Sequence, residues 1–493
     1  MNGPRRWGLR LRHRAAATAA GTVLDGGEVN RSKLVRLTRK LSWGLSDQAL
    51  SSGTNFALSA LIARSVSPAE FGLYSIAFAI YLIALNVSNG LTNDPLTVRF
   101  SHVGSHRQHV AISAAGGAAL VIGVVFGVGC LAAATLLSGP AQLTLLALGI
   151  GLPGLLLQDA WRHAFFIADR GRDAFINDLY WTLIQVSAYA GLILSGNATL
   201  LNLMLAWGLA ATAAAALGAY QLRLLPGVSL TWLWLRTQRD LAVRYLAEDL
   251  TLPGAGALQA WGLGAFGGLT AVGAFRGAEL LVLGPMNVAF RGLQLIAQPE
   301  ASRVLRQSVH RLARSAFVYG GARTLIALAW GGLVLLVPSS VGTALMGEVW
   351  LVAHPLLLPL TMSTALIGLT GGAEMGLRAL GAAKRSLRAR LVTAALTVAG
   401  VAGGAMVGGG LGAAWGYAIA NTLAWVHWRH ELRRGLRDWE HLEHAMADEA
   451  GRATPRVVGD FVYEPPWQQP TIGQPPGTGR AANQNGSAQR MPT

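Results

Sequence analysis

The chain has a single cysteine in 493 residues and few charged side chains. Cys130 alone cannot form an intrachain disulfide, and it excludes a metal site built from several cysteines. Charged residues make up 13% of the chain, against about 25% in a typical soluble protein. Hydrophobic residues make up 52%, and the mean hydropathy is +0.41. This composition excludes an ordinary soluble enzyme and is typical of a protein that crosses a membrane many times.

The sequence also lacks the short motifs that mark nucleotide sites and hydrolytic enzymes. It contains no P-loop, no dinucleotide-binding glycine fingerprint, no HExxH and no GxSxG. His102, His106 and His109 have a helical spacing that could converge on a metal, but no carboxylate accompanies them. We therefore expect no catalytic residue, no bound metal and no cofactor.

Positive charge is distributed in a regular pattern along the chain. All but three of the 40 Lys and Arg residues lie in the N-terminal arm, the C-terminal tail or every second gap between apolar stretches; the exceptions are Arg64, Arg276 and Arg323. Basic loops stay in the cytoplasm because positively charged segments resist translocation. The pattern predicts cytoplasmic N and C termini. It also indicates that the net charge of +16 serves to contact anionic lipids and not nucleic acid.

About twelve apolar segments are long enough to span a membrane, since a span needs ~20 mostly apolar residues. Their approximate limits are 43–64, 73–96, 110–137, 141–160, 174–195, 199–221, 248–268, 271–291, 316–338, 351–376, 389–407 and 411–428. The last two lie in one stretch without Asp, Glu, Lys or Arg, and we expect Gly408-Gly409-Gly410 to form the turn between them. The sequence predicts an all-α polytopic membrane protein.

Six regions follow from these patterns. We expect a basic cytoplasmic arm (1–41), a first six-helix bundle (42–226), an amphipathic linker helix on the membrane surface (227–247), a second six-helix bundle (248–428), a charged cytoplasmic helix (429–452) and a disordered tail (453–493). The linker is amphipathic because Trp232, Trp234 and Leu235 alternate with arginines. Two halves that both start inside are compatible with a parallel duplication, although the sequence shows no strong repeat.

Polar residues recur at helical spacing in the first two expected spans. The first span carries Asn55 in a stripe that Asp47 flanks, and the second carries Asn86, Asn89 and Asn93, followed by Asp94. Such stripes must face protein or water because polar groups facing lipid are costly. Two interpretations stay open at this stage, namely the lining of a cavity and hydrogen bonding between helices.

Ionisable residues inside other expected spans indicate functional sites by the same argument. They include Asp178, Arg276, Glu279 and Arg323, and Arg162 lies where the fourth span meets the cytoplasm. Arg276 and Glu279 are three residues apart on one predicted helix, so they could simply neutralise each other. A role in substrate binding is the alternative.

Several local motifs in order along the chain resemble those of a known transporter family. They are residues 67–74 (SPAEFGLY), 158–162 (QDAWR), Asn177-Asp178 with Trp181, 273–278 (GAFRGA), 283–287 (LGPMN) and 377–381 (LRALG). Over residues 35–430 the chain is similar to the polysaccharide flippases of the multidrug/oligosaccharidyl-lipid/polysaccharide exporter superfamily.

The resemblance implies two helix bundles around a central cavity, which transport a lipid-linked sugar by alternating access. For a polyprenyl-diphosphate-linked oligosaccharide, it suggests Arg276, Arg323 and Arg162 as cations for the diphosphate. Asn55, Asn86, Asn89 and Asn93 would then suit sugar hydroxyls. Asp47, Asp94 or Asp178 would bind the coupling proton or sodium. These assignments are hypotheses about the site.

Three other functions remain to be weighed. A drug or cation antiporter of the same superfamily would prefer an acidic cavity, which the intramembrane arginines disfavour. A membrane glycosyltransferase would need catalytic carboxylates in a sizeable outer loop, and the first such loop offers only Glu70. A scaffold for cell-envelope assembly could recruit biosynthetic proteins through the tail. We expect a non-enzymatic, multi-pass plasma-membrane transporter of an envelope polysaccharide precursor.

Overall fold

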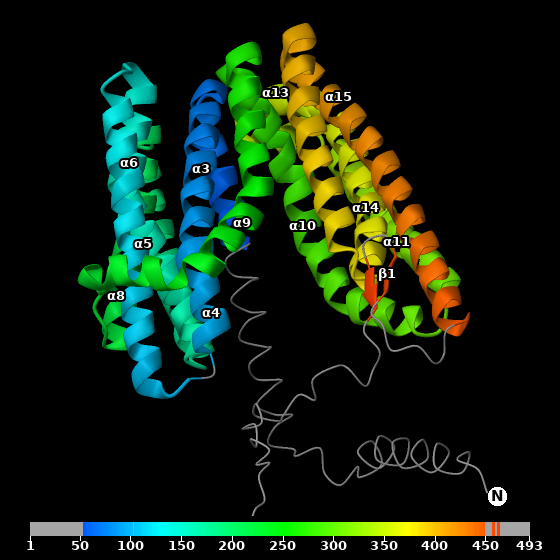
Figure 1. Cartoon of the computed structure of the whole chain (residues 1–493). Coiled ribbons are helices and arrows are strands. Elements are labelled where there is room, and N and C mark those ends of the chain that lie inside the picture. Colours follow the sequence, from blue (N-terminus) through cyan, green and yellow to red (C-terminus); the bar gives the residue numbers. More distant parts are fainter. Residues whose placement is uncertain (1–52, 102, 449–455, 459–460, 464–493) are drawn as a thin grey trace, which may run out of the picture.

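The computed structural model describes residues 53–101, 103–448, 456–458 and 461–463 (Figure 1). The basic arm 1–41, Asp47 and most of the tail lie outside the described residues. Nearly all of the described chain is helical, and its helices gather into two lobes joined by one long helix (Figure 1).

The first lobe contains a helical segment at 53–65 and the helices up to residue 222. They are α3 (Pro68–Ser88), the π-helical turn η1 (Asn89–Asn93), α4 (Asp94–Phe100), α5 (Ser105–Ala134), α6 (Gly139–Ile167), α7 (Gly171–Leu194) and α8 (Leu200–Leu222). The sequence sets the start of α3 locally. Ser67 and Glu70 form a reciprocal capping box, and Pro68 occupies the first turn, where its missing N–H costs nothing.

The second lobe is built from the helices that follow residue 268. They are α10 (Leu269–Leu305), α11 (Val309–Leu335), α12 (Ser339–Met346), α13 (Glu348–Ala353), the 3₁₀ turn η3 (His354–Leu356), α14 (Leu357–Ala379) and α15 (Ala383–Asp448). The long helix α15 is in fact two helices, because Gly408 and Gly409 have non-helical backbone angles. Gly409 has φ +55°, which glycine adopts without strain. The glycine turn predicted at 408–410 is therefore confirmed.

The two arms of α15 run back along each other over a glycine-lined seam. A Cβ atom at Gly400 would meet the backbone of Gly416, and one at Gly404 would meet the backbone of Gly412. Small residues let two membrane helices approach this closely. The second arm continues past the apolar region as the charged helix expected from 429 onward, and it ends at Asp448.

The linker between the lobes differs from the expectation in its extent. After the 3₁₀ turn η2 (Val228–Leu230), helix α9 runs without interruption from Thr231 to Gly267, so the predicted linker and the seventh span are one helix. In Figure 1, the first part of α9 crosses the first lobe and the rest turns upward beside α3. Trp234 is buried against Phe100 and donates a hydrogen bond to the carbonyl of Leu91. One face of this amphipathic segment is thus covered by protein.

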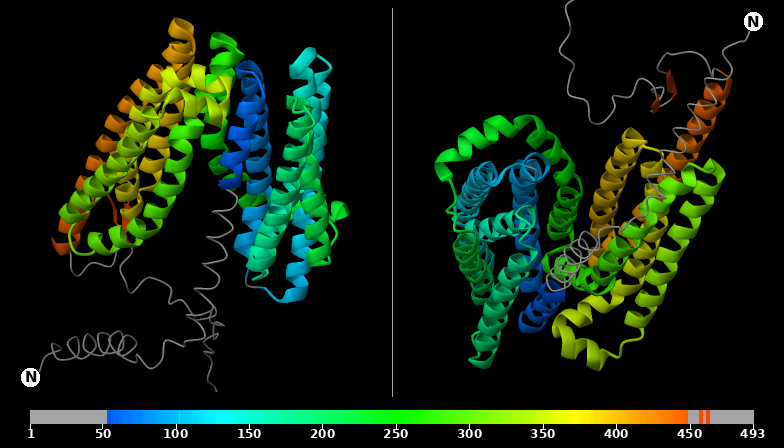
Figure 2. Two further views of the ribbon diagram at one scale, coloured as in Figure 1. Left: turned by 180° about the vertical axis from the view of Figure 1, so that it is seen from behind. Right: turned by 90° about the horizontal axis from the view of Figure 1, so that it is seen from below.

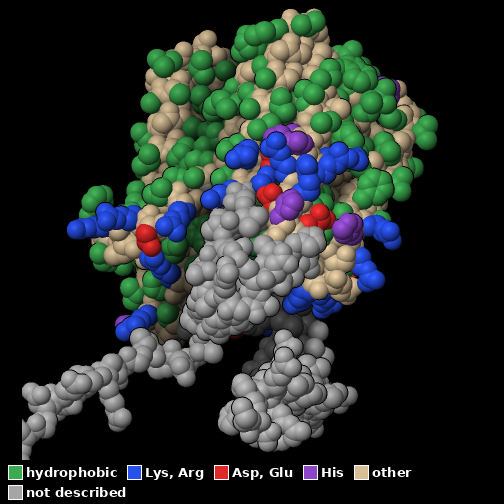
Figure 3. All heavy atoms as spheres, turned by 45° about the vertical axis from the view of Figure 1, so that its right-hand side comes forward, with side chains coloured by type: hydrophobic (Ala, Val, Ile, Leu, Met, Phe, Trp, Pro, Cys, Tyr) green, Lys and Arg blue, Asp and Glu red, His purple; other side chains and the backbone are tan. Residues whose placement is uncertain are grey.

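The two lobes meet at one end and diverge at the other (Figures 1 and 2). They meet where α3 and α10 begin, because a Cβ atom at Gly72 would strike the carbonyl of Leu269, and one at Gly273 would strike the carbonyl of Pro68. Within the described part of the chain, the segments between spans that carry most of the Lys and Arg residues lie toward the diverging end (Figures 1 and 3). The basic segments, which occupy every second gap between apolar stretches in the sequence, therefore lie at one end of the molecule.

Among the described residues, eight helices are long and apolar enough to cross a membrane. They are Pro68–Phe100, Ser105–Ala134, Gly139–Ile167, Leu200–Leu222, Leu269–Gln294, Val309–Leu335, Glu348–Ala379 and Ala383–Leu442, the last being the two-armed α15. Helices α7 and α9 cover two further expected spans. The protein is an all-helical membrane protein. The total of about twelve spans and the cytoplasmic position of both termini stay predictions.

A short antiparallel pair follows the helical part. Strand β1 (Arg456–Val458) pairs with β2 (Phe461–Tyr463), with Val457 opposite Val462. The tail expected from 453 onward to be disordered thus has local structure at these residues.

Candidate functional site

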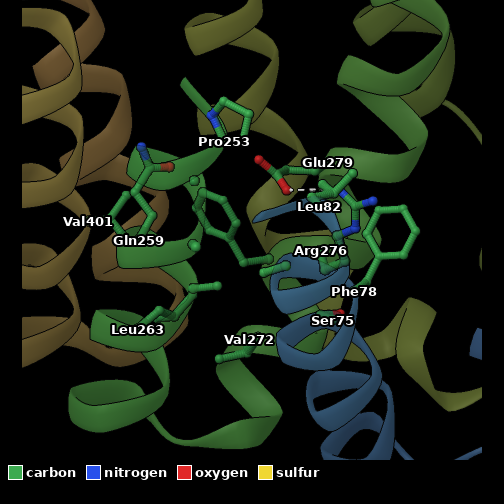
Figure 4. A pocket seen from close by; sticks show the side chains of 15 residues that line it. Ser75, Phe78, Leu82, Pro253, Gln259, Leu263, Val272, Arg276, Glu279 and Val401 are labelled. Atoms are coloured by element: carbon green, nitrogen blue, oxygen red, sulfur yellow. Dashed lines mark hydrogen bonds and ion pairs between the residues drawn. The ribbon is translucent and has the colours of Figure 1, made fainter. Parts of the chain in front are cut away.

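A cavity of about 180 Å³ lies at the junction of the two lobes, and we call it the central pocket. Four elements line it: α3 from the first lobe, and α9, α10 and α15. Most of the lining is apolar, and its polar members are Ser75, Gln259, Arg276 and Glu279. In Figure 4, Gln259 lies across the pocket from Arg276. A few polar groups in an apolar hollow between two lobes are typical of a ligand site.

Among the described residues, Arg276 is the only cation that lines this pocket. Its guanidinium lies 3.5 Å from the Glu279 carboxylate and 5.2 Å from the centre of the Phe78 ring. The Arg276 side chain keeps 31% exposure, so the guanidinium is accessible from the pocket. The sequence left open whether Arg276 neutralises Glu279 or binds a substrate, and the contact that neutralisation requires is present. At 3.5 Å this contact lies at the outer limit of a hydrogen bond.

A second polar region lies inside the first lobe, where η1 faces α6. The π-helical turn places Asn89 and Asn93 on one side, and the Asn93 amide donates hydrogen bonds to Asn89 at 2.6 Å and to Asp159 at 3.1 Å. His163, one turn after Asp159, contacts the same carboxylate at 3.5 Å. Turns of π-helix occur often at functional sites. Asn89 and Asn93 therefore belong to a polar network between helices.

Arg162 and Asp178 continue this network toward α7. The Arg162 guanidinium contacts the Asp178 carboxylate at 3.1 Å, and the Asp178 side chain is only 6% exposed. Gln158 donates to the other Asp178 oxygen at 2.9 Å, and Asn177 donates to the Ala214 carbonyl at 2.9 Å. Buried charges require such partners. The geometry thus joins Arg162 and Asp178, which the sequence analysis assigned to different roles.

Arg323 is enclosed within the second lobe, on α11. It is 8% exposed, and its guanidinium carbon lies 4.1 Å from the centre of the Phe290 ring and 5.5 Å from that of Tyr319. Gly371 of α14 leaves the space that the guanidinium occupies. Arg323 and Arg276 therefore lie in different surroundings, one packed within a lobe and the other between the lobes.

The remaining candidates are spread through the first lobe. Asn55 is exposed on the segment 53–65, and the Asn86 amide donates to the Leu82 carbonyl one turn earlier. Asp94 is half-buried at the start of α4 and has no ion pair within the described part of the chain. Asp47 is not described. The structure thus brings Asn89 and Asn93 together, and separately Arg162 and Asp178.

Two members of the central pocket were not expected from the sequence, whereas the further members of the network in the first lobe lie in the quoted motifs but had no role assigned to them. Phe78 and Gln259 line the central pocket, and Gln158, Asn177 and Asp159 complete the network in the first lobe. The spacing of Gln158 and Arg162, four residues apart on α6, was a usable signal because such residues share a helix face. No spacing could have revealed Phe78, since an aromatic ring inside a span is ordinary.

Comparison with solved structures places this fold in a known class. The chain superposes on an inward-facing multidrug resistance MATE family transporter of the MOP superfamily with a TM-score of 0.58, covering 82% of this chain and 99% of that one at 14% identity. It superposes on the lipid II flippase MurJ in an inward closed conformation with a TM-score of 0.60, covering 84% and 94% at 9% identity. No family model and no curated protein matches its sequence.

The chain therefore has the fold of the MOP superfamily transporters, and these structural neighbours are transporters rather than enzymes. The resemblance read from its motifs is confirmed at the level of this superfamily fold. Membership of the polysaccharide flippases within the superfamily stays a prediction, because sequence identities of 14% and 9% establish similarity of the fold alone.

Proposed function

We propose that this protein moves a lipid-linked oligosaccharide or polysaccharide precursor across the plasma membrane by alternating access, as a step in making an envelope polysaccharide. The observation that carries the proposal is Arg276, a cation placed inside a pocket between two lobes of a transporter fold. A guanidinium binds phosphate oxygens through paired hydrogen bonds. The diphosphate of such a precursor would meet Arg276, while its polyprenyl tail stays in the lipid.

The shape of the lobes supports this mechanism. They are joined at one end by backbone contacts between α3 and α10 and open toward the basic loops. A head group could enter from the basic end, and rocking of one lobe against the other would then expose it on the opposite side. Asn55, Asn86, Asn89 and Asn93 are candidates to contact the sugar during this passage. Arg162 and Arg323 remain proposed anion ligands only if the lobes rearrange, because each is already packed against protein partners.

Ion coupling is proposed for the first lobe. Asp178 is buried among Arg162 and Gln158, and Asp94 lies directly after the π-helical turn. Asp47 is the third candidate. Protonation of, or sodium binding to, a carboxylate inside a span changes the charge that the helices must accommodate, which can bias two conformations.

The deciding experiment is transport of a fluorescent polyprenyl-diphosphate oligosaccharide in proteoliposomes, with and without a proton or sodium gradient. Arg276→Ala should abolish transport, and Asp94→Asn should remove its dependence on the gradient. The matched control is Arg303→Ala, which breaks an exposed pair with Glu300 at the same three-residue spacing on the same helix. Equal transport by the Arg276 variant and the unaltered protein would contradict the proposed role of the pocket.

A drug or cation antiporter is the second candidate, because one structural neighbour is a multidrug resistance transporter and Glu279 offers a carboxylate in the pocket. Gradient-driven export of a lipophilic cation, together with no movement of the diphosphate lipid, would establish it. A scaffold without transport activity would move neither compound. Binding of envelope-biosynthesis proteins to the C-terminal tail would support that third role.

A further inference from the structure

The base of the α15 hairpin carries a hollow of about 480 Å³, which we call the cationic hollow. Its lining residues are Arg385, Arg388, His430, Arg434, Arg437, Asp438 and His441. Arg385 and Arg388 come from the first arm of α15, and the others come from the second arm. On the second arm, the basic residues recur at steps of one helical turn, so they share one face.

The charges in the cationic hollow do not balance. Asp438 and the buried Glu431 both contact Arg385, the latter at 3.1 Å, so the two carboxylates are engaged with one arginine. Arg388 and Arg434 are exposed and have no carboxylate partner within the described residues. Together with Arg437, these two arginines give the hollow an excess of positive charge.

The cationic hollow lies at the edge of the apolar surface. On the same two arms, large apolar side chains are exposed just beyond it: Leu387 at 52%, Leu391 at 51%, Leu423 at 51% and Val426 at 53%. Figure 3 shows Lys, Arg and His side chains gathered directly below the hydrophobic part of the surface. In a membrane protein, this border lies at the depth of the lipid head groups.

We infer that the cationic hollow binds the head group of an anionic phospholipid of the leaflet it faces, with Arg388 and Arg434 as its main phosphate ligands. Basic pockets between membrane helices bind phospholipid head groups that carry more than one phosphate, and the number of cations here suits a lipid with two phosphodiesters. The acyl chains would lie along the exposed leucines and Val426. The glycine seam between the arms holds both arginines on one rigid hairpin. The inference does not depend on which substrate is transported.

Lipid binding to the purified full-length chain, measured by native mass spectrometry, tests this site. We expect diphosphatidylglycerol, which has two phosphodiesters, to bind at least tenfold more tightly than phosphatidylcholine. The double variant Arg388→Gln/Arg434→Gln should lose roughly thirtyfold in that affinity, because each arginine near the head groups contributes on the order of 1 kcal/mol. The control Arg311→Gln/Arg314→Gln removes the same charge from exposed positions on α11 and should stay within about twofold.

Other outcomes would overturn the inference. Equal loss in both double variants would show that the effect is net charge and not a site. Equal affinity for phosphatidylcholine would remove the role of the phosphate charge. Inorganic pyrophosphate that displaces the lipid at matching concentrations would assign the cationic hollow to a soluble anion. Thermal unfolding of each variant in detergent would confirm that all of them are folded.

Discussion

Gly72 and Gly273 occupy equivalent places in the two lobes, each in the second turn of its helix, and each leaves room for the other helix. A Cβ atom at Gly72 would strike the carbonyl of Leu269, and one at Gly273 would strike the carbonyl of Pro68. These carbonyls belong to the first residues of α10 and α3. The contact is therefore reciprocal, as expected for two halves related by an approximate two-fold axis. The parallel duplication itself stays a prediction, because the sequence shows no strong repeat.

Replacing either glycine with a larger residue should increase the separation of the two lobes at the end where they meet. We expect Gly72→Val or Gly273→Val to lower the thermal stability and to reduce transport strongly, because overpacking at a backbone contact costs about 1–3 kcal/mol. Distances between spin labels on the two lobes would report the separation. Gly292→Ala, on the same helix as Gly273 but with open space around it, should leave both properties unchanged. Unaltered distances in the valine variants would contradict the role of this contact.

A substitution at Glu279 distinguishes transport of an anionic lipid-linked precursor from transport of a cationic drug. If the substrate is anionic, Glu279→Gln should tighten its binding severalfold, because the carboxylate competes with the ligand for the Arg276 guanidinium at 3.5 Å. If the substrate is cationic, the same change should abolish binding. Binding of a diphosphate lipid and of a lipophilic cation, compared in one preparation, provides the measurement. Glu300→Gln, in the exposed pair on the same helix, serves as the control.

Substitution of Arg323 should lower the stability of the folded protein more than it changes substrate binding. Arg323→Ala removes a side chain that is 8% exposed and stacked over Phe290, so we expect a loss of about 2–4 kcal/mol from the cavity and the missing cation–π contact. Arg323→Lys keeps the charge but not the planar group, and should recover only part of the loss. The check is thermal unfolding in detergent beside substrate affinity. A normal unfolding temperature with weakened substrate binding would make Arg323 a ligand instead.

Lowering the pH should weaken the contact between the first part of α9 and the first lobe. Arg99 contacts Asp240 at 2.5 Å; despite a desolvation effect that raises the carboxyl pKa, the hydrogen bond from Arg99 holds the pKa of Asp240 below its usual value. A lowered pKa in the folded state means that the stabilisation is present above the unfolded pKa, near 4, and is lost as the pH falls through the lowered value.

We therefore expect the protection factors of the amides in the first part of α9, which correct the exchange rates for the intrinsic effect of pH, to fall at acidic pH in the unaltered protein. Asp240→Asn should show low protection factors at all pH values. Asp169→Asn, which changes an exposed carboxylate in the α6–α7 loop, should keep the original pH dependence of protection. Protection factors in this region that do not change with pH would mean that Trp234 and the backbone contacts alone hold the linker.

The membrane character, the alternation of basic loops and the turn at Gly408–Gly410 could be predicted because each depends on local composition. An apolar stretch must be helical to satisfy its backbone inside lipid, and glycine is needed where the backbone leaves the helical region. The amphipathic linker was predictable for the same reason. Its fusion with the next span was not expected, because the amphipathic composition ends near residue 248, but the absence of glycine and proline between Thr231 and Pro253 agrees with one continuous helix.

The tertiary structure alone decided which polar groups meet. Arg162 and Asp178 lie on different helices, and Asn93 reaches Asp159 across 66 positions of sequence. Spacing along one helix cannot determine such contacts, because they depend on how helices pack. The same holds for the two intramembrane arginines, which look alike in the sequence. The sequence determined that both are costly to bury, and only the packing of the lobes placed Arg276 in a pocket and Arg323 against aromatic rings.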